Sequence, residues 1–285
     1  VHFDRSNAQI RIYENDVLSQ IASGIEEFLS QAETSNGHRL ILVTAQSGTG
    51  LQRCLEKYKT YRESIDPGKT AFVYLETYYY RECLQYLGHR PRDAPAQEPL
   101  PSELPAIFRL NQRTLRRAWS RALRTAAAEI NDHLVERDVF FSFSSSFYHH
   151  ESRSVFSPVD LGLLLDIMTG RRRKGLARFE HLQGALRRES LLVVTLIDDI
   201  FDCFARLSRP RANDVFDPTN LAPEFPPRSA ILRVLLEWRH FEVRFAEGIA
   251  RGLGRDHLVF PTKHPLATFH RILEGKPVCS PVRQH

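Results

Sequence analysis

Long apolar runs, paired cysteines and internal repeats are all missing from this 285-residue sequence. No uninterrupted apolar segment approaches the roughly 20 residues that cross a bilayer, so we expect no membrane partner. Cysteine pairs at metal-ligand spacing are also missing, which argues against a structural zinc site or a disulfide framework and favours a reducing compartment. The first residues show no charged segment followed by an apolar run, so we expect a cytoplasmic protein without a signal peptide.

The sequence also lacks a large excess of one charge. Its 39 lysines and arginines exceed the 34 aspartates and glutamates by five, which is too few to establish nucleic-acid binding but is compatible with a phosphate-bearing ligand. Hydrophobic residues make up 42% of the chain, enough to form a core, and this excludes disorder for most of its length. We therefore expect a single domain over residues 1–285.

Short apolar runs alternate with helix-length amphipathic segments along the chain. Strands are predicted at residues 39–44, 71–75, 139–143, 191–197 and 257–260. Helices are predicted at residues 16–31, 51–61, 110–134, 160–168, 200–207 and 230–253. Continuous rather than alternating apolar strands are typical of a sheet covered on both faces, and intervening helices form parallel crossovers. The sequence therefore predicts a three-layer α/β/α fold with a mostly parallel five-stranded sheet.

Two proline-rich segments interrupt this pattern near residues 88–105 and 208–228. Long loops inside a compact domain are often lids or binding segments, and we interpret both as lid-like insertions. The second carries Arg209 and Arg211, which are candidates for contact with an anionic substrate.

A glycine-containing turn joins the first predicted strand to the helix at residues 51–61. Its residues that are expected to hold phosphate through backbone N–H groups are Gln46, Ser47, Gly48, Thr49 and Gly50. Glycines let several N–H groups face one anion, and the following helix adds its positive N-terminal end. The alternative is a plain turn between a strand and a helix in an unrelated α/β fold.

This turn resembles the Walker A loop of P-loop NTPases, whose pattern is G-x-x-x-x-G-K-[ST]. Gly50 matches the last glycine of the pattern, whereas Ala45 stands at the first. Leu51 replaces the lysine that neutralises phosphates, and Gln52 replaces the hydroxyl that holds Mg²⁺. The resemblance therefore implies a P-loop fold with a degenerate Walker A loop.

The fourth predicted strand ends in two acids, Asp198 and Asp199. An apolar strand that ends in acids resembles the Walker B motif, in which an acid engages Mg²⁺. The two acids lie near the glycine turn only if the first and fourth strands are neighbours. The alternative is that Asp199 caps the helix that begins at Ile200.

Hydroxyl groups and histidines follow the third predicted strand, among them Ser144 and His149. At the carboxyl end of a strand these side chains can line a substrate pocket, and the alternative is a solvated serine-rich turn. Adjacent histidines on an extended chain point in opposite directions, which argues against a metal site formed by His149 and His150.

Arginines are clustered on the predicted helices. Those that share one face of the helix at residues 110–134 are Arg113, Arg117, Arg121 and Arg124. A phosphate-binding loop without its lysine needs positive charge from elsewhere. The candidates to supply it are these arginines and the clusters near residues 171–188, 206–211 and 228–244, which include Arg206 and Arg239. The alternative for each cluster is a solvated helix face.

The order of these parts is similar to that of the nucleoside and nucleotide kinases within the P-loop NTPases. This resemblance implies Mg-ATP or Mg-GTP as the ligand and phosphoryl transfer to a small nucleoside or phosphorylated substrate. It also implies that Asp198 or Asp199 organises Mg²⁺ and that Arg206, Arg209 or Arg211 closes over the transferring group.

Two other functions fit the sequence. Leu51 and Gln52 are compatible with a catalytically degenerate scaffold that acts as a regulatory or adaptor subunit for a protein partner. The arginine clusters are compatible with nucleic-acid binding, although they lack the interleaved aromatic residues of a single-strand platform. At this point it stays open whether the chain is an enzyme.

Overall fold

The computed structural model describes residues 38–88, 106–107, 109–149, 154–171, 179–187, 190–207 and 227–274. The chain divides into two compact units. One comprises residues 37–263, and the other comprises residues 1–36 and 264–285, in which α10 (Leu266–Leu273) is described. The helix expected at residues 16–31 and most of both expected lid-like insertions lie outside the described residues, and the single domain stays a prediction.

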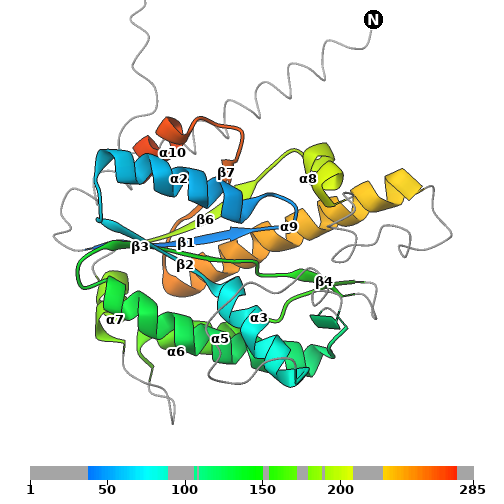
Figure 1. The fold of residues 1–285 in the computed structure, drawn as a ribbon, viewed down its shortest axis with the longest axis horizontal. Coiled ribbons are helices and arrows are strands. Elements are labelled where there is room, and N and C mark those ends of the chain that lie inside the picture. Colours follow the sequence, from blue (N-terminus) through cyan, green and yellow to red (C-terminus); the bar gives the residue numbers. More distant parts are fainter. Residues whose placement is uncertain are drawn as a thin grey trace, which may run out of the picture. The chain divides into compact units, whose positions relative to one another are not determined.

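A five-stranded parallel sheet forms the centre of the larger unit (Figure 1). Its strands are β1 (Leu40–Ala45), β2 (Thr70–Tyr74), β3 (Asp138–Phe143), β6 (Leu191–Ile197) and β7 (His257–Pro261). Their order across the sheet is β2-β3-β1-β6-β7, and every neighbouring pair is parallel. In register, Leu40 of β1 lies between Val139 of β3 and Leu191 of β6. The predicted α/β fold with a five-stranded sheet is confirmed.

Helices cover both faces of this sheet within the larger unit (Figure 1). They are α2 (Leu51–Ile65), α3 (Leu75–Tyr86), α5 (Gln112–His133), α6 (Leu161–Thr169), α7 (Glu180–Arg187), α8 (Ile200–Leu207) and α9 (Pro227–Leu253). α2 lies on one face, and α3, α5, α6, α7 and α9 share the other. None of the helices in the described part of the chain is long and apolar enough to cross a membrane.

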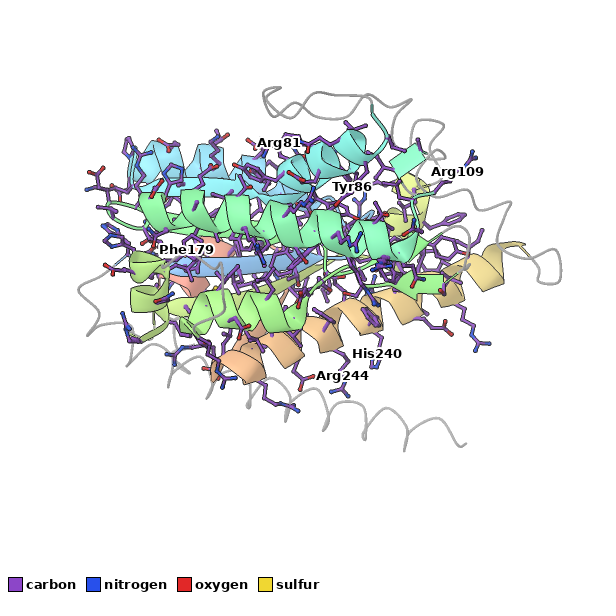
Figure 2. All side chains as sticks on the ribbon, turned by 90° about the horizontal axis from the view of Figure 1, so that it is seen from below. Arg81, Tyr86, Arg109, Phe179, His240 and Arg244 are labelled. Carbon is purple, nitrogen blue, oxygen red and sulfur yellow. The ribbon has the colours of Figure 1, made fainter. Side chains whose placement is uncertain are left out.

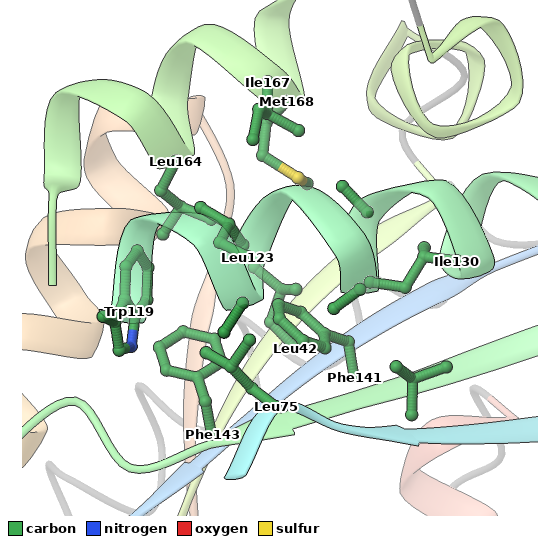
Figure 3. Close-up of a cluster of buried hydrophobic side chains, with 14 of the residues drawn as sticks. Leu42, Leu75, Trp119, Leu123, Ile130, Phe141, Phe143, Leu164, Ile167 and Met168 are labelled. Atoms are coloured by element: carbon green, nitrogen blue, oxygen red, sulfur yellow. The ribbon is translucent and has the colours of Figure 1, made fainter. Parts of the chain in front are cut away.

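The main core lies between the sheet and the layer that contains α5 and α6 (Figure 3). α5 presents an apolar stripe that includes Trp119, Leu123 and Ile130, and each of these side chains is nearly inaccessible to solvent. They pack on Leu42 and Phe141 of the sheet. Because β1 is buried along its whole length, both of its faces must be apolar, which is why its sequence is a continuous apolar run.

The chain connections change direction at the centre of the sheet. From β1 the chain crosses to β2 at one edge, whereas from β3 it crosses β1 to reach β6. Ligands of open α/β sheets bind at such a switch point, beyond the carboxyl ends of the strands. The topology therefore directs attention to the residues that follow β1, β3 and β6.

Candidate functional site

Polar residues follow each strand along the carboxyl edge of the sheet. The strand order places them in the sequence Glu76 after β2, Ser144 after β3, the turn at residues 46–50 after β1, Asp198 after β6 and Lys263 after β7. The pairing of β1 with β6 meets the condition for bringing Asp198 close to the glycine turn.

The turn after β1 is shaped by two glycines in the left-handed region. Gly48 has φ +85° and Gly50 has φ +82°, a conformation that costs an L-residue roughly 1–2 kcal/mol. The N–H of Thr49 donates to the carbonyl of Gln46 at 3.1 Å. Gly50 then occupies the N-cap of α2 without a capping side chain. Within the described residues, the N–H groups of Gly48, Gly50 and Leu51 have no protein acceptor.

Two side chains of this turn have structural contacts. The Nε2 of Gln46 donates to the carbonyl of Leu235 on α9 at 3.0 Å, and Gln46 is buried. Thr49 is also buried, with its hydroxyl 4.0 Å from Cys203 Sγ. These contacts fix the turn against α8 and α9, so the side chains of Gln46 and Thr49 are engaged within the protein.

Asp198 is held by two arginines at the end of β6. Its carboxylate accepts a hydrogen bond from Arg206 Nη2, and its backbone carbonyl accepts one from Arg239 Nη2. Arg206 Nε also donates to the carbonyl of Gly48 at 2.5 Å. The side chain of Asp198 is only 5% exposed, whereas that of Arg206 is 32% exposed. One guanidinium therefore links the glycine turn to the predicted Walker B acid.

Asp199 has the geometry of a helix cap. Its Oδ1 accepts from the N–H of Phe201 at 2.8 Å, and its carbonyl accepts from the N–H of Cys203 at 2.9 Å. This is the alternative that we considered for Asp199. No group of three or more metal-ligating His, Cys, Asp or Glu side chains occurs among the described residues. The role of Asp198 or Asp199 toward Mg²⁺ stays a prediction.

α8 packs directly on the glycine turn. A Cβ added to Gly48 would lie 2.8 Å from Leu207 Cγ and 3.2 Å from the carbonyl oxygen of Cys203. Gly48 is therefore required by close approach as well as by its backbone conformation. By contrast, a Cβ at Gly50 would meet no atom within 4 Å, so the open side of the turn is at Gly50.

A second polar cluster lies at the carboxyl end of β3. Glu242 of α9 accepts from the N–H of Ser145 at 2.8 Å and from the hydroxyl of Ser146 at 2.6 Å. Trp238 Nε1 donates to the same Ser146 hydroxyl at 2.9 Å. Ser144 donates its N–H to Glu76 at 2.6 Å. Ser145 and Ser146 are fully buried, so a solvated serine-rich turn is wrong for this part of the segment.

Both glutamates of this cluster have perturbed acidity. Burial raises the pKa of Glu242 to about 7; the hydrogen bonds from Ser146 and Ser145 act in the opposite direction, and the charge of Glu76 raises the pKa further. Burial also raises the pKa of Glu76, against the hydrogen bond from the Ser144 N–H. Perturbed carboxyl groups at the carboxyl edge of a sheet are candidates for proton transfer.

The remaining predicted site residues lie in different parts of the structure or outside its described residues. Arg239 joins the Asp198 group. Ser144 contacts Glu76 at the carboxyl edge of the sheet through its backbone N–H. His149 is the last residue of β4 (Phe147–His149), which forms an antiparallel hairpin with β5 (Ser154–Phe156). Arg209 and Arg211 lie outside the described residues.

Glu242 and Trp238 are not among the site residues predicted from the sequence. A signal for Glu242 is present, because the apolar stripe of α9 contains Leu235, Trp238, Ala246 and Ile249 and is interrupted by one acid at residue 242. A charged residue on a buried helix stripe requires polar partners. The partners, on the segment after β3, could not be identified from this pattern alone.

Comparison with known proteins provides little beyond this geometry. No protein-family model matches the chain, and no curated protein matches it. The solved structure of shikimate kinase from Acinetobacter baumannii in complex with shikimate is similar to 85% of this chain and 96% of that chain. The sequence identity is 11% and the TM-score is 0.38, and we draw nothing about the site from this match.

Proposed function

We propose that this chain binds a nucleoside phosphate at the carboxyl edge of its sheet, as a P-loop protein of kinase-like fold. The observation that carries the proposal is the set of N–H groups on Gly48, Gly50 and Leu51, at the topological switch point, that have no acceptor among the described residues. Such groups at a helix N-terminus attract phosphate, because they donate hydrogen bonds and lie at the positive end of the helix dipole. The partial exposure of these three residues leaves them open to a ligand.

Arg206 supplies the positive charge that the missing lysine would provide. Its guanidinium already contacts the carbonyl of Gly48, so a small rotation of the side chain brings it over a phosphate in the turn. Arg239 donates to the backbone carbonyl of Asp198. Arginine forms bidentate contacts with phosphate, and two arginines replace one lysine in this proposal.

Phosphoryl transfer to a small substrate is the finer form of the proposal. Mg²⁺ in such sites keeps several waters and uses one or two carboxylates together with the nucleotide phosphates. Asp198 fits this need when Arg206 turns from its carboxylate to a phosphate. Burial and the charge of Glu76 raise the pKa of Glu242 to about 7, and a pKa near the operating pH suits proton transfer at the same edge of the sheet.

A catalytically degenerate scaffold is the second candidate function. It is favoured by Leu207, which lies against Gly48, and by Leu51 and Gln52 at the positions of the expected lysine and hydroxyl. In this case the fold is kept for a protein partner and the turn has no phosphate affinity.

Two matched glycine variants test phosphate binding. Gly50 and Gly68 have φ of +82° and +72°, and a Cβ meets nothing within 4 Å at either position. Gly50→Trp and Gly68→Trp therefore carry similar backbone strain, but only the first places an indole at the turn. Isothermal titration with Mg-ATP and Mg-GTP should detect binding to the wild type and to Gly68→Trp, and none to Gly50→Trp. Equal binding to both variants would refute the proposal.

Restoring the family pattern separates the two candidate functions. The double variant Leu51→Lys with Gln52→Thr should gain about tenfold in nucleotide affinity, which is roughly 1.4 kcal/mol. A wild type that binds no nucleotide and a double variant that gains none would support the scaffold.

A further inference from the structure

A groove lined by arginines lies on the outer surface of the helix layer, away from the glycine turn. Its volume is about 920 Å³, and its walls come from the end of α3, the first half of α5 and the start of α6. Figure 2 views this surface and shows α5 between α3 and α6, with Tyr86 beside α5. The arginines that line the groove are Arg113, Arg116, Arg117, Arg121 and Arg124.

Among the described residues, little negative charge faces these arginines. The one carboxylate among the described lining residues is that of Asp160, and its Oδ1 accepts from the N–H of Leu163 at 2.9 Å as the N-cap of α6. Arg121 lies 3.9 Å from Glu82. Among the described residues, Arg113, Arg117 and Arg124 have no acidic partner.

This arrangement is unfavourable for the helix that carries it. Arg113, Arg117 and Arg121 are spaced four residues apart, and like charges at this spacing on a helix are destabilising. α5 has no acidic residue in its first turn, so the positive end of its dipole adds to the repulsion. A local arrangement that opposes stability is expected where a ligand compensates for it.

The arginines that line the groove form a row along α5 from Arg113 to Arg124, and the shape of this arginine row fits a linear polyanion. A rise of 1.5 Å per residue places Arg113 and Arg124 about 16 Å apart along the helix axis. One phosphate or carboxylate would neutralise only one end of this row, whereas a chain of phosphates can follow it.

An exposed tyrosine in the lining of the groove favours nucleic acid over an acidic peptide as its ligand. The Tyr86 side chain is 38% exposed, and the guanidinium of Arg121 lies over its ring at 5.4 Å from the centroid. An exposed ring beside a row of cations can stack a base while the cations hold the backbone. This aromatic residue comes from α3, because the aromatic residue within the arginine-rich segment, Trp119, is buried in the core.

We propose that the groove between α3, α5 and α6 binds single-stranded nucleic acid, with the arginine row on its phosphates and Tyr86 stacked on a base. The groove is separate from the nucleotide turn and does not depend on the function proposed there.

Fluorescence anisotropy of a labelled thymidine oligonucleotide of about 12 nucleotides tests this assignment. The full-length wild type should bind at low salt, and Arg117→Gln with Arg124→Gln should weaken binding at least tenfold. Removing two phosphate contacts should also reduce the slope of log affinity against log salt by about 1.4. The control is Arg244→Gln with Arg251→Gln on α9, which changes the net charge equally at exposed arginines paired with Glu247.

Tyr86 distinguishes base stacking from charge alone. Tyr86→Phe should bind like the wild type, and Tyr86→Ala should lose about tenfold for the oligonucleotide. Competition with inorganic polyphosphate and with poly-glutamate should be weaker than with unlabelled oligonucleotide. Equal competition by either polymer, equal losses in the α9 control, or no binding by the wild type would overturn the proposal. Circular dichroism of each variant checks that it is folded.

Discussion

At the scale of single residues, the buried charge of Asp198 is compensated by the guanidinium of Arg206. The carboxylate is almost completely removed from water and its charge is matched by a guanidinium that is one-third exposed. Removing one partner of such a pair leaves the other charge without compensation, which costs more than the pair contributes. The same guanidinium also donates to Gly48, so the pair contributes to the shape of the glycine turn.

Arg206→Ala should therefore lower the free energy of unfolding by about 2 kcal/mol, as measured by urea denaturation. The double variant Asp198→Asn with Arg206→Ala should be no less stable than Arg206→Ala alone, because no unpaired charge stays buried. Arg233→Ala is the control, since its pair with Glu237 is exposed and is expected to contribute less than 1 kcal/mol. Strictly additive losses in the Asp198 and Arg206 cycle would contradict this account.

At the scale of elements, α5 is the helix on which the main core is built. Leu123 is 1% exposed and contacts the buried cluster between α5, α6 and the sheet (Figure 3). Truncation to alanine removes apolar contacts and leaves a cavity. Leu123→Ala should cost about 3 kcal/mol in urea denaturation, whereas Arg124→Ala on the exposed face of the same helix should change stability by less than about 0.5 kcal/mol. Similar costs for the two variants would show that this part of the core is loosely packed.

The central strands β1 and β6 were predictable because burial on both faces leaves a continuous apolar run. β6 and α8 have the bounds that the sequence predicts, and α5 differs by one or two residues at its ends. α3 was not predicted, because its three consecutive tyrosines obscure the helical period. α7 and α10 were also missed; each has only eight residues, and neither directly follows a predicted strand as the equally short α8 does.

The candidate site was less predictable than the fold. The turn after β1 and the acids after β6 carry local sequence patterns, and strand pairing brings them together. Glu242 acquires its partners from residues 96 and 97 positions away in the chain. Such a contact depends on how α9 crosses the sheet edge, and no local pattern encodes that crossing.

At the scale of the whole molecule, the buried glutamates couple folding to pH. Glu242 joins α9 to the segment after β3, and Glu76 joins α3 to the same segment. Glu76 is the titratable group that faces Glu242, and its charge raises the pKa of Glu242. Protonation of this pair therefore affects three elements that meet at one edge of the sheet.

The sign of the effect follows from burial. The pKa of Glu242 rises from 4.5 to about 7 on folding, so between these values the folded state binds more protons than the unfolded chain. The free energy of unfolding should then fall as pH rises from about 4.5 to about 7, by a few kcal/mol, and level off above that range. Burial raises the pKa of Glu76 as well, and its contribution has the same sign.

Urea denaturation at a series of pH values measures this dependence. Glu242→Gln removes the titrating proton and keeps a side chain of the same shape, so its stability should decline less steeply than that of the wild type between pH 5 and about pH 7. Glu237→Gln, at an exposed position earlier on α9, should follow the wild-type profile. A Glu242→Gln profile parallel to that of the wild type would mean that Glu242 is already ionised in the folded protein. In that case the hydrogen bonds from Ser145 and Ser146 outweigh burial, and Glu242 would serve as a fixed negative charge at the carboxyl edge instead of a group that exchanges a proton near neutral pH.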